Sequence, residues 1–247
     1  MGEETINNIE EYLTLIKSSK AENVLRGNSI DFLFRGQSMD YPLIPKLGRL
    51  TPKGELLKVE RTIFQEFKRT NQLLIDQHRP LDDWDYLTLG QHFGLPTRLL
   101  DWSKNALTAL WFASGANIIE DRELEGNSVV WILMADEDDY LLDIDTVDPF
   151  SIATTKIIQP RIIKQRINNQ SGIFSIASSS EIIDRKMLNE SANFSEKLIK
   201  VKIAKENLRE IRHDLNTLGV NAFTIFPELE GLCAYLHWRY FEELTIK

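Results

Sequence analysis

The sequence predicts one mixed domain of α-helices and β-strands, of the α/β or α+β class. Stretches whose apolar residues recur at the helical period of about 3.6 alternate with short apolar runs of strand length. No internal repeat, low-complexity tract or linker divides the 247 residues, and one large domain can have this length. We therefore expect a single domain over residues 1–247.

Several stretches have the apolar periodicity of helices. Their expected ranges are 5–18, 53–75, 84–93, 104–119, 206–218 and 227–238. Ser103 can cap the helix that begins at residue 104, because its hydroxyl can accept a hydrogen bond from a backbone N–H of the first turn. Gly219 suits a helix end and Pro227 a helix start. The helix after Ser103 is apolar nearly all round, so we expect it at the centre of the fold.

Strands are expected where short apolar runs lie between turn residues. The first covers residues 30–37 and breaks at Gly36. The run 128–134, SVVWILM, predicts a strand that is buried on both faces. Residues 197–203 alternate and predict a strand with a solvated basic face. The other extended segments are expected at 97–101, 157–163, 166–176 and, as a strand or a turn, 221–226.

The composition indicates a soluble, cytoplasmic protein. No window approaches the roughly 20 consecutive apolar residues of a membrane-spanning helix. The acidic start of the chain lacks the layout of a secretory signal, and the lone Cys233 excludes an intrachain disulfide. A net charge of −8 disfavours broad attraction to nucleic acid. We interpret the acidic run 135–148 as a solvated loop, because it lacks the turn glycine of a calcium-binding loop.

Familiar catalytic and metal-binding motifs are absent from the sequence. It contains no phosphate-binding G-x-x-x-x-G-K-[ST], no G-x-G-x-x-G, no H-E-x-x-H and no G-x-S-x-G. The four histidines lack the spacing of metal ligands, so we expect no metal site.

Residues 84–113 combine polar side chains with apolar runs. Burying a polar group costs free energy unless the group finds a partner, so this stretch predicts a hydrogen-bonded network. We expect the network to hold a loop–strand–helix unit against the strand that carries Arg35. Its polar members are Gln91, His92, Thr97, Arg98 and Asp101.

Arg35 is the most informative single residue. An arginine at the end of a strand can bind a phosphate, and the bare backbone of Gly36 beside it lets a ligand approach. The alternative is an ion pair with Asp31 or Asp101 that only holds a loop. The sequence alone leaves both interpretations open.

Five further candidates also have two interpretations. Arg98 can face a ligand or form a buried ion pair with a carboxylate, and His92 can exchange protons or be a core histidine. Gln170 can present its amide to a ligand or close a turn. Glu228 and Glu230 follow Pro227, where carboxylates can be catalytic or can complement a helix N-terminus.

Five motifs in order along the chain resemble the FRG domain family. They are FLFRGQS (32–38), QHFGLPTRLLDWS (91–103), ALWFA (109–113), RINNQSGIF (166–174) and FPELEGL (226–232). The resemblance extends over a motif core at residues 30–232, most of the chain, preceded by the helix at residues 5–18. This resemblance indicates the family of the chain more directly than it indicates an activity.

An arginine and glycine ending an early strand are also similar to the first motif of the Arg-Ser-Glu class of ADP-ribosyltransferases. That resemblance implies a central split β-sheet flanked by helices and NAD as the substrate, with no metal. It makes Arg35, Ser103 and Glu228 the catalytic candidates, with Glu230 and Glu196 as rivals for the acid. The chain departs from the class because it has no Ser-Thr-Ser run.

The same resemblance implies a set of residues that contact NAD, with Trp102 or Phe93 stacking on one of its rings. The candidate NAD-binding residues are Arg35, Gly36, Gln37, His92, Thr97, Arg98, Asp101, Trp102 and Gln170. The expected function is ADP-ribosylation of a protein or nucleic acid by a bacterial toxin or phage-defence effector, held by an antitoxin or regulatory protein. The alternative is a non-catalytic module that binds a nucleotide or nucleic acid as a sensor. A nuclease is disfavoured because no carboxylate metal cluster is evident.

Overall fold

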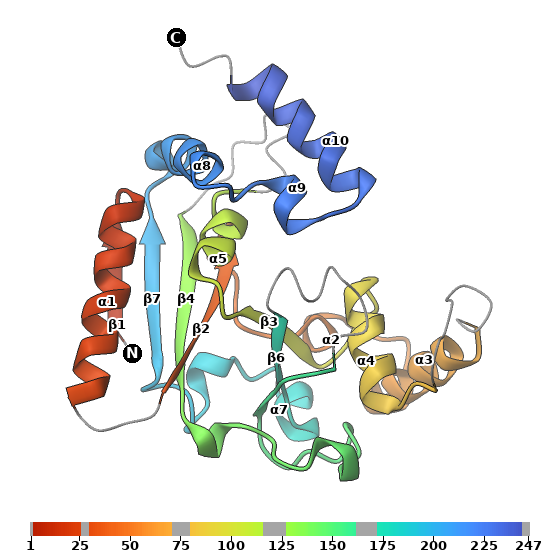
Figure 1. Cartoon of the computed structure of the whole chain (residues 1–247). Coiled ribbons are helices and arrows are strands. Elements are labelled where there is room, and N and C mark those ends of the chain that lie inside the picture. Colours follow the sequence, from red (N-terminus) through yellow and green to blue (C-terminus); the bar gives the residue numbers. More distant parts are fainter. Residues whose placement is uncertain (1, 26–29, 71–79, 116–126, 162–171, 244–247) are drawn as a thin grey trace.

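A seven-stranded sheet lies at the centre of the chain (Figure 1). The computed structural model describes residues 2–25, 30–70, 80–115, 127–161 and 172–243. The strand order is β1-β7-β4-β2-β3-β6-β5; β1 and β7 are parallel and the other neighbours antiparallel. The strands are β1 (Gly2–Ile6), β2 (Asp31–Gln37), β3 (Leu99–Ser103), β4 (Ser128–Ala135), β5 (Lys156–Ile158), β6 (Gly172–Ile176) and β7 (Leu198–Ile203).

The sheet narrows between β2 and β3. Strand β2 pairs with β4 along the seven residues Asp31–Gln37, but with β3 through one pair, Phe34 with Ser103. Strand β3 then runs beside β6 over five pairs. The sheet therefore has two halves, β1-β7-β4-β2 and β3-β6-β5, and we call their junction the seam.

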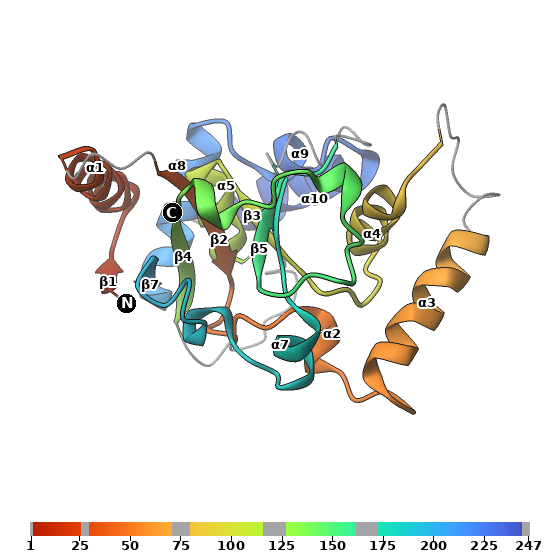
Figure 2. The ribbon, with the colours of Figure 1, turned by 90° about the horizontal axis from the view of Figure 1, so that it is seen from below.

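The helices lie on both faces of the sheet and around its ends. Figure 2 shows α1 and α3 at opposite sides of the molecule. The α-helices of the described part are α1 (Ile9–Leu25), α2 (Lys46–Arg49), α3 (Leu56–Thr70), α4 (Asp83–His92), α5 (Ala106–Ala113), α7 (Ser179–Ile183), α8 (Leu208–Thr217), α9 (Ala222–Ile225) and α10 (Leu229–His237).

Among the described residues, buried apolar side chains form four clusters, and the three larger ones lie between sheet and helices. On one face of the first half, α1, α5 and α8 pack against side chains such as Phe34 and Ile132. On the opposite face, Leu33 and Trp131 belong to a second cluster, as the alternation of side chains along a strand requires. The third cluster joins α3 and α4 to the second half of the sheet, with Phe174 among its members.

Most predicted elements are confirmed. The buried strand at β4, the alternating strand at β7 and the helix closed by Gly219, whose φ is +80°, are all present. The first helix is also present, but sequence periodicity missed the mostly exposed β1 before it, which pairs with β7. Residues 221–226, expected as a strand or a turn, contain the short helix α9. The architecture is mixed and consistent with the α+β class, and the strands form one sheet.

Two local predictions were wrong for identifiable reasons. The cap of α5 is Asn105, whose Oδ1 accepts the backbone N–H groups of Leu107 and Thr108. Ser103 is the last residue of β3, and its Oγ accepts the N–H of Asn105. Gly36 does not break β2, since it pairs with Val130 inside the strand.

Gly36 is needed because α5 crosses β2 at this point. A Cβ on Gly36 would lie 1.8 Å from the carbonyl oxygen of Ala109 and 2.7 Å from the backbone nitrogen of Ala113. A helix backbone can approach a strand this closely only where the strand has no side chain. The sequence suggested that the bare backbone of Gly36 lets a ligand approach. In the structure, the group that approaches Gly36 closely is the backbone of α5.

Candidate functional site

The seam is hollowed by two neighbouring cavities, of about 580 Å³ and 340 Å³. We call the larger the first cavity and the smaller the second cavity. Both are lined by Arg35, Gly36, Phe112 and Phe226. They therefore meet where β2 and β3 diverge, beyond the Phe34–Ser103 pair.

Arg35 bridges the two halves of the sheet at that point. Its Nη1 donates a hydrogen bond of 2.8 Å to the backbone oxygen of Asp101 and lies 3.6 Å from the Asp101 carboxylate. Burial lowers the pKa of Arg35 below its usual value, Asp101 opposes this shift, and Arg49 adds to it by repulsion. The group stays charged, because arginine is protonated in proteins.

The bond to Asp101 uses only part of the guanidinium group. The Nε of Arg35 is buried and has no hydrogen-bond partner among the described residues. Unpaired buried donors are uncommon and call for an explanation, such as a bound ligand or water. The interpretation of Arg35 as a partner of Asp101 is thus confirmed, and it leaves donors for a ligand.

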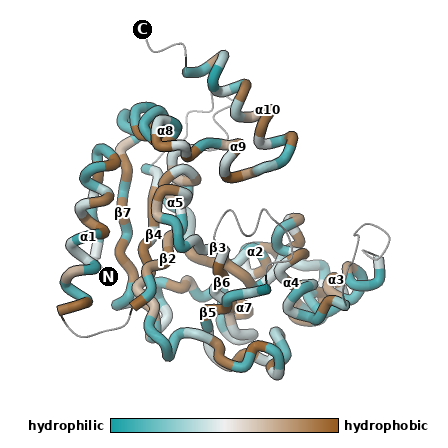
Figure 3. The backbone as a smooth tube through the Cα atoms, in the orientation of Figure 1, coloured by the Kyte–Doolittle hydropathy of each residue, from teal (hydrophilic) through white to brown (hydrophobic). Residues whose placement is uncertain are grey.

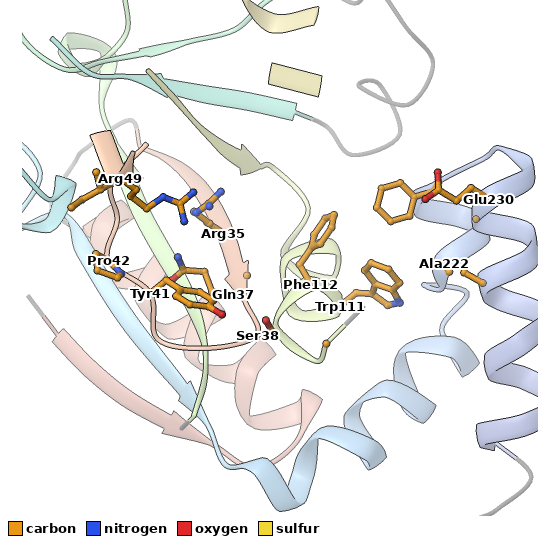
Figure 4. Close-up of a pocket in the computed structure, with 16 residues that line it drawn as sticks. Arg35, Gln37, Ser38, Tyr41, Pro42, Arg49, Trp111, Phe112, Ala222 and Glu230 are labelled. Atoms are coloured by element: carbon orange, nitrogen blue, oxygen red, sulfur yellow. The ribbon is translucent and has the colours of Figure 1, made fainter. Parts of the chain in front are cut away.

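Arg49 and Gln37 extend the polar wall of the first cavity. Figure 4 shows the guanidinium groups of Arg35 and Arg49 together on one side of the cavity, near Gln37 and Tyr41. Arg49 is exposed and has no hydrogen bond or ion pair with any described residue. The Oε1 of Gln37 accepts the indole N–H of Trp131 at 3.0 Å, so its amide NH₂ group is directed elsewhere.

Three aromatic rings form the apolar wall. The ring centroids of Trp111, Phe112 and Phe226 lie 5.3, 5.8 and 6.0 Å apart in edge-to-face contacts. Two of the rings come from α5 and the third follows α9. The Gly36 contact positions α5 on β2, so it sets how far these rings stand from Arg35.

One of the three candidate glutamates lines a cavity. Glu230, in the first turn of α10, lies on the wall of the first cavity across from Arg35 and Arg49 (Figure 4). Glu228 is the exposed residue before α10, and Glu196 is exposed before β7; neither lines either cavity. Glu228 makes no side-chain capping bond to α10. The geometry therefore favours Glu230 over Glu228 as the carboxylate of this site.

The second cavity contains most of the candidates from residues 84–113. Asp101 and Ser103 face it from β3, together with Gln91 and His92 from α4. The Thr97 hydroxyl donates to Gln91 Oε1 at 2.5 Å, and Gln91 Nε2 donates to Asp101 Oδ2 at 2.9 Å. This chain of hydrogen bonds ends at Arg35, so the predicted network is confirmed for these members.

Thr97 and Arg98 lie away from both cavities. Arg98 is only 1% exposed, and its Nε donates to Glu60 Oε1 at 2.7 Å while its Nη2 bonds the other carboxylate oxygen. Its guanidinium also lies over the Phe150 ring. The alternative interpretation of Arg98, a buried ion pair, is the one that the structure supports. Thr97 acts through Gln91, so neither residue is positioned to touch a ligand.

Trp102 borders the second cavity, but its ring is not available to stack on a ligand there. The ring packs in the core on the opposite face of the sheet, and its indole N–H donates to Ser175 Oγ at 3.0 Å. Phe93, the other stacking candidate, is exposed and contacts His92 edge-on. The aromatic residues that line both cavities are instead Phe112 and Phe226. Gln170 lies outside the described residues.

Sequence reasoning missed Arg49 and the aromatic wall. Arg49 ends the proline-containing segment 41–49, and the only sequence signal for it was a second arginine close behind Arg35. Phe112 belongs to the motif ALWFA, in which apolar residues suggested core packing alone. Among the described residues, no group of three or more His, Cys, Asp or Glu side chains could hold a metal ion.

The fold and the site define a mixed α and β protein with an arginine-lined site at the seam of its sheet. The family model described as FRG domain matches residues 30–122. The match includes β2, α5 and three of the five motifs; the motifs at 166–174 and 226–232 lie beyond it. Neither the curated proteins nor the solved structures contain a match. Over the described residues, no helix has both the length and the apolar character to cross a bilayer.

Proposed function

We propose that the two cavities bind NAD and that the protein is an ADP-ribosyltransferase-like enzyme. One observation carries the proposal: Arg35 and Arg49 face Glu230 across a cavity with an aromatic wall. Guanidinium groups suit the pyrophosphate of a dinucleotide, and aromatic rings suit its flat bases. The cavity volumes, about 580 and 340 Å³, fall in the range of roughly 300–1,000 Å³ that is usual for ligand sites.

The proposed reaction transfers ADP-ribose from NAD to a macromolecule. The bond between the nicotinamide nitrogen and the ribose breaks, and its electron pair leaves with nicotinamide. A nucleophile of the acceptor forms the new bond to the same ribose carbon and loses its proton. The transition state has oxocarbenium character, as in glycoside hydrolysis, so a carboxylate beside the ribose stabilises its positive charge.

Each residue has a stated part in this proposal. Arg35 and Arg49 hold the phosphates, and Phe112 packs on a ring of the dinucleotide. Glu230 takes the catalytic role for which Glu228 was the first candidate, because Glu230 lines the cavity. Ser103 and Asp101 line the second cavity, where the other end of NAD would lie.

The biological setting belongs to the same proposal. We keep a cytoplasmic toxin or phage-defence effector, held by an antitoxin or regulatory protein, as the role that the family resemblance favours. The net charge of −8 makes a protein or a narrow RNA groove a better acceptor than duplex nucleic acid.

Release of nicotinamide from NAD by the purified full chain tests the activity. Glu230→Gln should lower the rate by about a hundredfold or more, since a group that stabilises transition-state charge typically contributes this much. Glu228→Gln is the matched control, because Glu228 is an exposed glutamate two positions away that lines neither cavity. Equal loss in both variants, or no nicotinamide release with any protein or RNA acceptor, would overturn the proposal.

The second candidate function is a sensor that binds a nucleotide without chemistry. One observation favours it: Glu230 is exposed and has no hydrogen-bond or ion-pair partner among the described residues to hold it against a ribose. Calorimetry with NAD distinguishes the two functions. Binding that needs Arg35 and Arg49, with NAD recovered intact, would favour the sensor.

A further inference from the structure

Helix α10 has two faces with different surroundings. Its inner face contains Gly231, Ala234, Tyr235 and the following Trp238, which line cavities or pack toward the core. Its outer face bears a second set of apolar side chains that are exposed. We call this set the outer stripe: Leu229, Cys233, Leu236 and, in the turn after the helix, Tyr240.

The spacing of the outer stripe is that of a helix that packs against another helix. At about 100° per residue, the four side chains project within an arc of about 60°. Leu229 is 80% exposed and Tyr240 59% exposed, so the described chain does not cover the stripe. Figure 1 shows α10 at the rim of the molecule, and Figure 3 shows hydrophobic residues along it.

The charges beside the outer stripe are divided between its two ends. Glu228 and Glu230 lie at the N-terminal end of α10, and His237 and Arg239 at the C-terminal end. Glu228 and Arg239 are about three turns apart and therefore lie on the same side of the helix. Arg239 donates one hydrogen bond to Tyr235 Oη at 3.1 Å, and His237 lies 3.4 Å from Glu242. The other N–H groups of Arg239 have no hydrogen-bond partner among the described residues.

We propose that the outer stripe packs against the outer stripe of a second copy of this chain, with the two helices antiparallel. In that arrangement the N-terminal end of each helix, with Glu228, meets the C-terminal end of the other, with Arg239. Glu228 of each copy then faces Arg239 of the other, on the two sides of a twofold axis. A parallel arrangement would instead bring the two N-terminal ends, each with Glu228 and Glu230, to the same end of the pair, and like charges repel.

The twofold axis has a defined place along the helix. The midpoint between Glu228 and Arg239 falls between residues 233 and 234, so the axis passes beside Cys233. Each patch then meets itself, which is the condition for a closed, isologous dimer. One helix stripe is small compared with a stable interface of about 1,600 Å², so the dimer is weak and depends on protein concentration.

The dimer also has a consequence for the first cavity. The inner face of α10 carries Gly231 and Ala234 on the wall of that cavity. Pairing through the outer stripe therefore supports the wall from behind without covering the cavity. The experiments that test the dimer do not depend on NAD turnover.

Sedimentation equilibrium of the full chain over a range of concentrations is the first test. The unmodified protein should show a monomer–dimer equilibrium, and Leu236→Glu should raise the dissociation constant by at least about tenfold, because it buries a charge in each half of the interface. Leu142→Glu is the matched control, since Leu142 is an exposed leucine on the acidic loop. Circular dichroism should show that both variants are folded. A monomer at all concentrations, or a dimer that Leu236→Glu leaves unchanged, would overturn the proposal.

Charge reversal tests the antiparallel arrangement. Glu228→Arg and Arg239→Glu should each weaken the dimer several-fold, and the double variant should restore it, because the reversed charges meet again across the axis. An additive loss in the double variant would contradict antiparallel self-pairing.

Cys233 supplies an independent measurement. A short bismaleimide should join two copies through this residue, the lone cysteine of the chain, and Leu236→Glu should abolish the product. Cross-linking that needs another protein from the host, with none in the purified chain, would assign the stripe to a different partner and overturn the proposal.

Discussion

Arg35 and Arg98 are both held inside the protein, but their guanidinium groups are used in different ways. Arg98 is 1% exposed and gives two bonds to Glu60, with Ala177 and Ser179 as further acceptors. Arg35 is 19% exposed on its side chain, gives one bond to Asp101, and keeps a buried Nε without a partner among the described residues.

The difference separates a structural arginine from a binding one. A buried charge is tolerated when its partners are complete, as at Arg98. An incomplete set of partners beside a cavity indicates a place for an external anion, as at Arg35. Residue type alone could not distinguish the two, since both are arginines beside apolar strand residues: Arg35 follows Phe34, and Arg98 precedes Leu99.

The largest effect should come from breaking the Arg98–Glu60 pair. Arg98→Met leaves the Glu60 carboxylate buried without its partner, so we expect the free energy of unfolding to fall by about 3–5 kcal/mol. Urea denaturation measures the loss. Adding Glu60→Leu should recover most of it, and a cost under about 1 kcal/mol for the single variant would show that Arg98 is not a brace.

Gly36→Ala should have the next largest effect, because it disrupts the contact between α5 and β2 that positions the cavity walls. The added methyl would lie 1.8 Å from the Ala109 oxygen, so α5 and β2 must separate. Forcing atoms into a packed site costs about 1–3 kcal/mol and sometimes more. Thermal unfolding gives the cost. Gly54→Ala is the control, because its nearest neighbour would be a side-chain atom at 3.7 Å.

Arg49→Ala tests whether an arginine without partners contributes to ligand affinity rather than to stability. Arg49 is exposed and unpaired within the described chain, so its removal should change stability by less than about 0.5 kcal/mol. NAD affinity should fall about tenfold, equivalent to about 1.4 kcal/mol. Isothermal calorimetry measures this, with Arg209→Ala, an exposed arginine of α8, as the control. Equal affinity in both variants would remove Arg49 from the site.

The smallest expected effect on stability concerns the ion pair between Lys197 and Asp136. Lys197 bonds Asp136 at 2.7 Å and lowers the pKa of that carboxyl below its usual 3.8. A carboxyl whose pKa is lowered by folding stabilises the protein above its unfolded pKa, and this contribution is lost as pH falls through the folded pKa. Asp136→Asn should therefore weaken the protein slightly at pH 7 and by less at about pH 2, where more of the Asp136 carboxyl is protonated in the folded state. Urea denaturation at both pH values checks the sign.

The sequence predicted the elements better than their junctions. Strands β4 and β7 follow from apolar patterns that depend only on burial of one or both faces. The mostly exposed β1 has no such pattern, since its pairing with β7 is a property of the assembled sheet. Asn105 replaced Ser103 as the helix cap because β3 continues for two residues more than its apolar run suggested.

The site was predicted in part for a similar reason. Arg35, Asp101 and Gln91 could be found from the sequence, because polar residues within apolar runs need partners. Arg49 and Glu230 could not be ranked, since solvent exposure of a single charged residue explains each of them equally well. Their relation to Arg35 depends on how the segment 41–49 and α10 fold over the seam.

The seam has a mechanical consequence. Between β2 and β3 the sheet has its weakest cross-section, one residue pair and the Arg35–Asp101 bond, whereas β2 and β4 share seven pairs. Strain or denaturant should separate the two halves there before it opens either half, because local opening begins where the fewest bonds resist it. A ligand that contacts both Arg35 and Asp101 would act as a tie across this cross-section. The force needed to separate the two halves of the sheet would then be higher when a ligand fills the site.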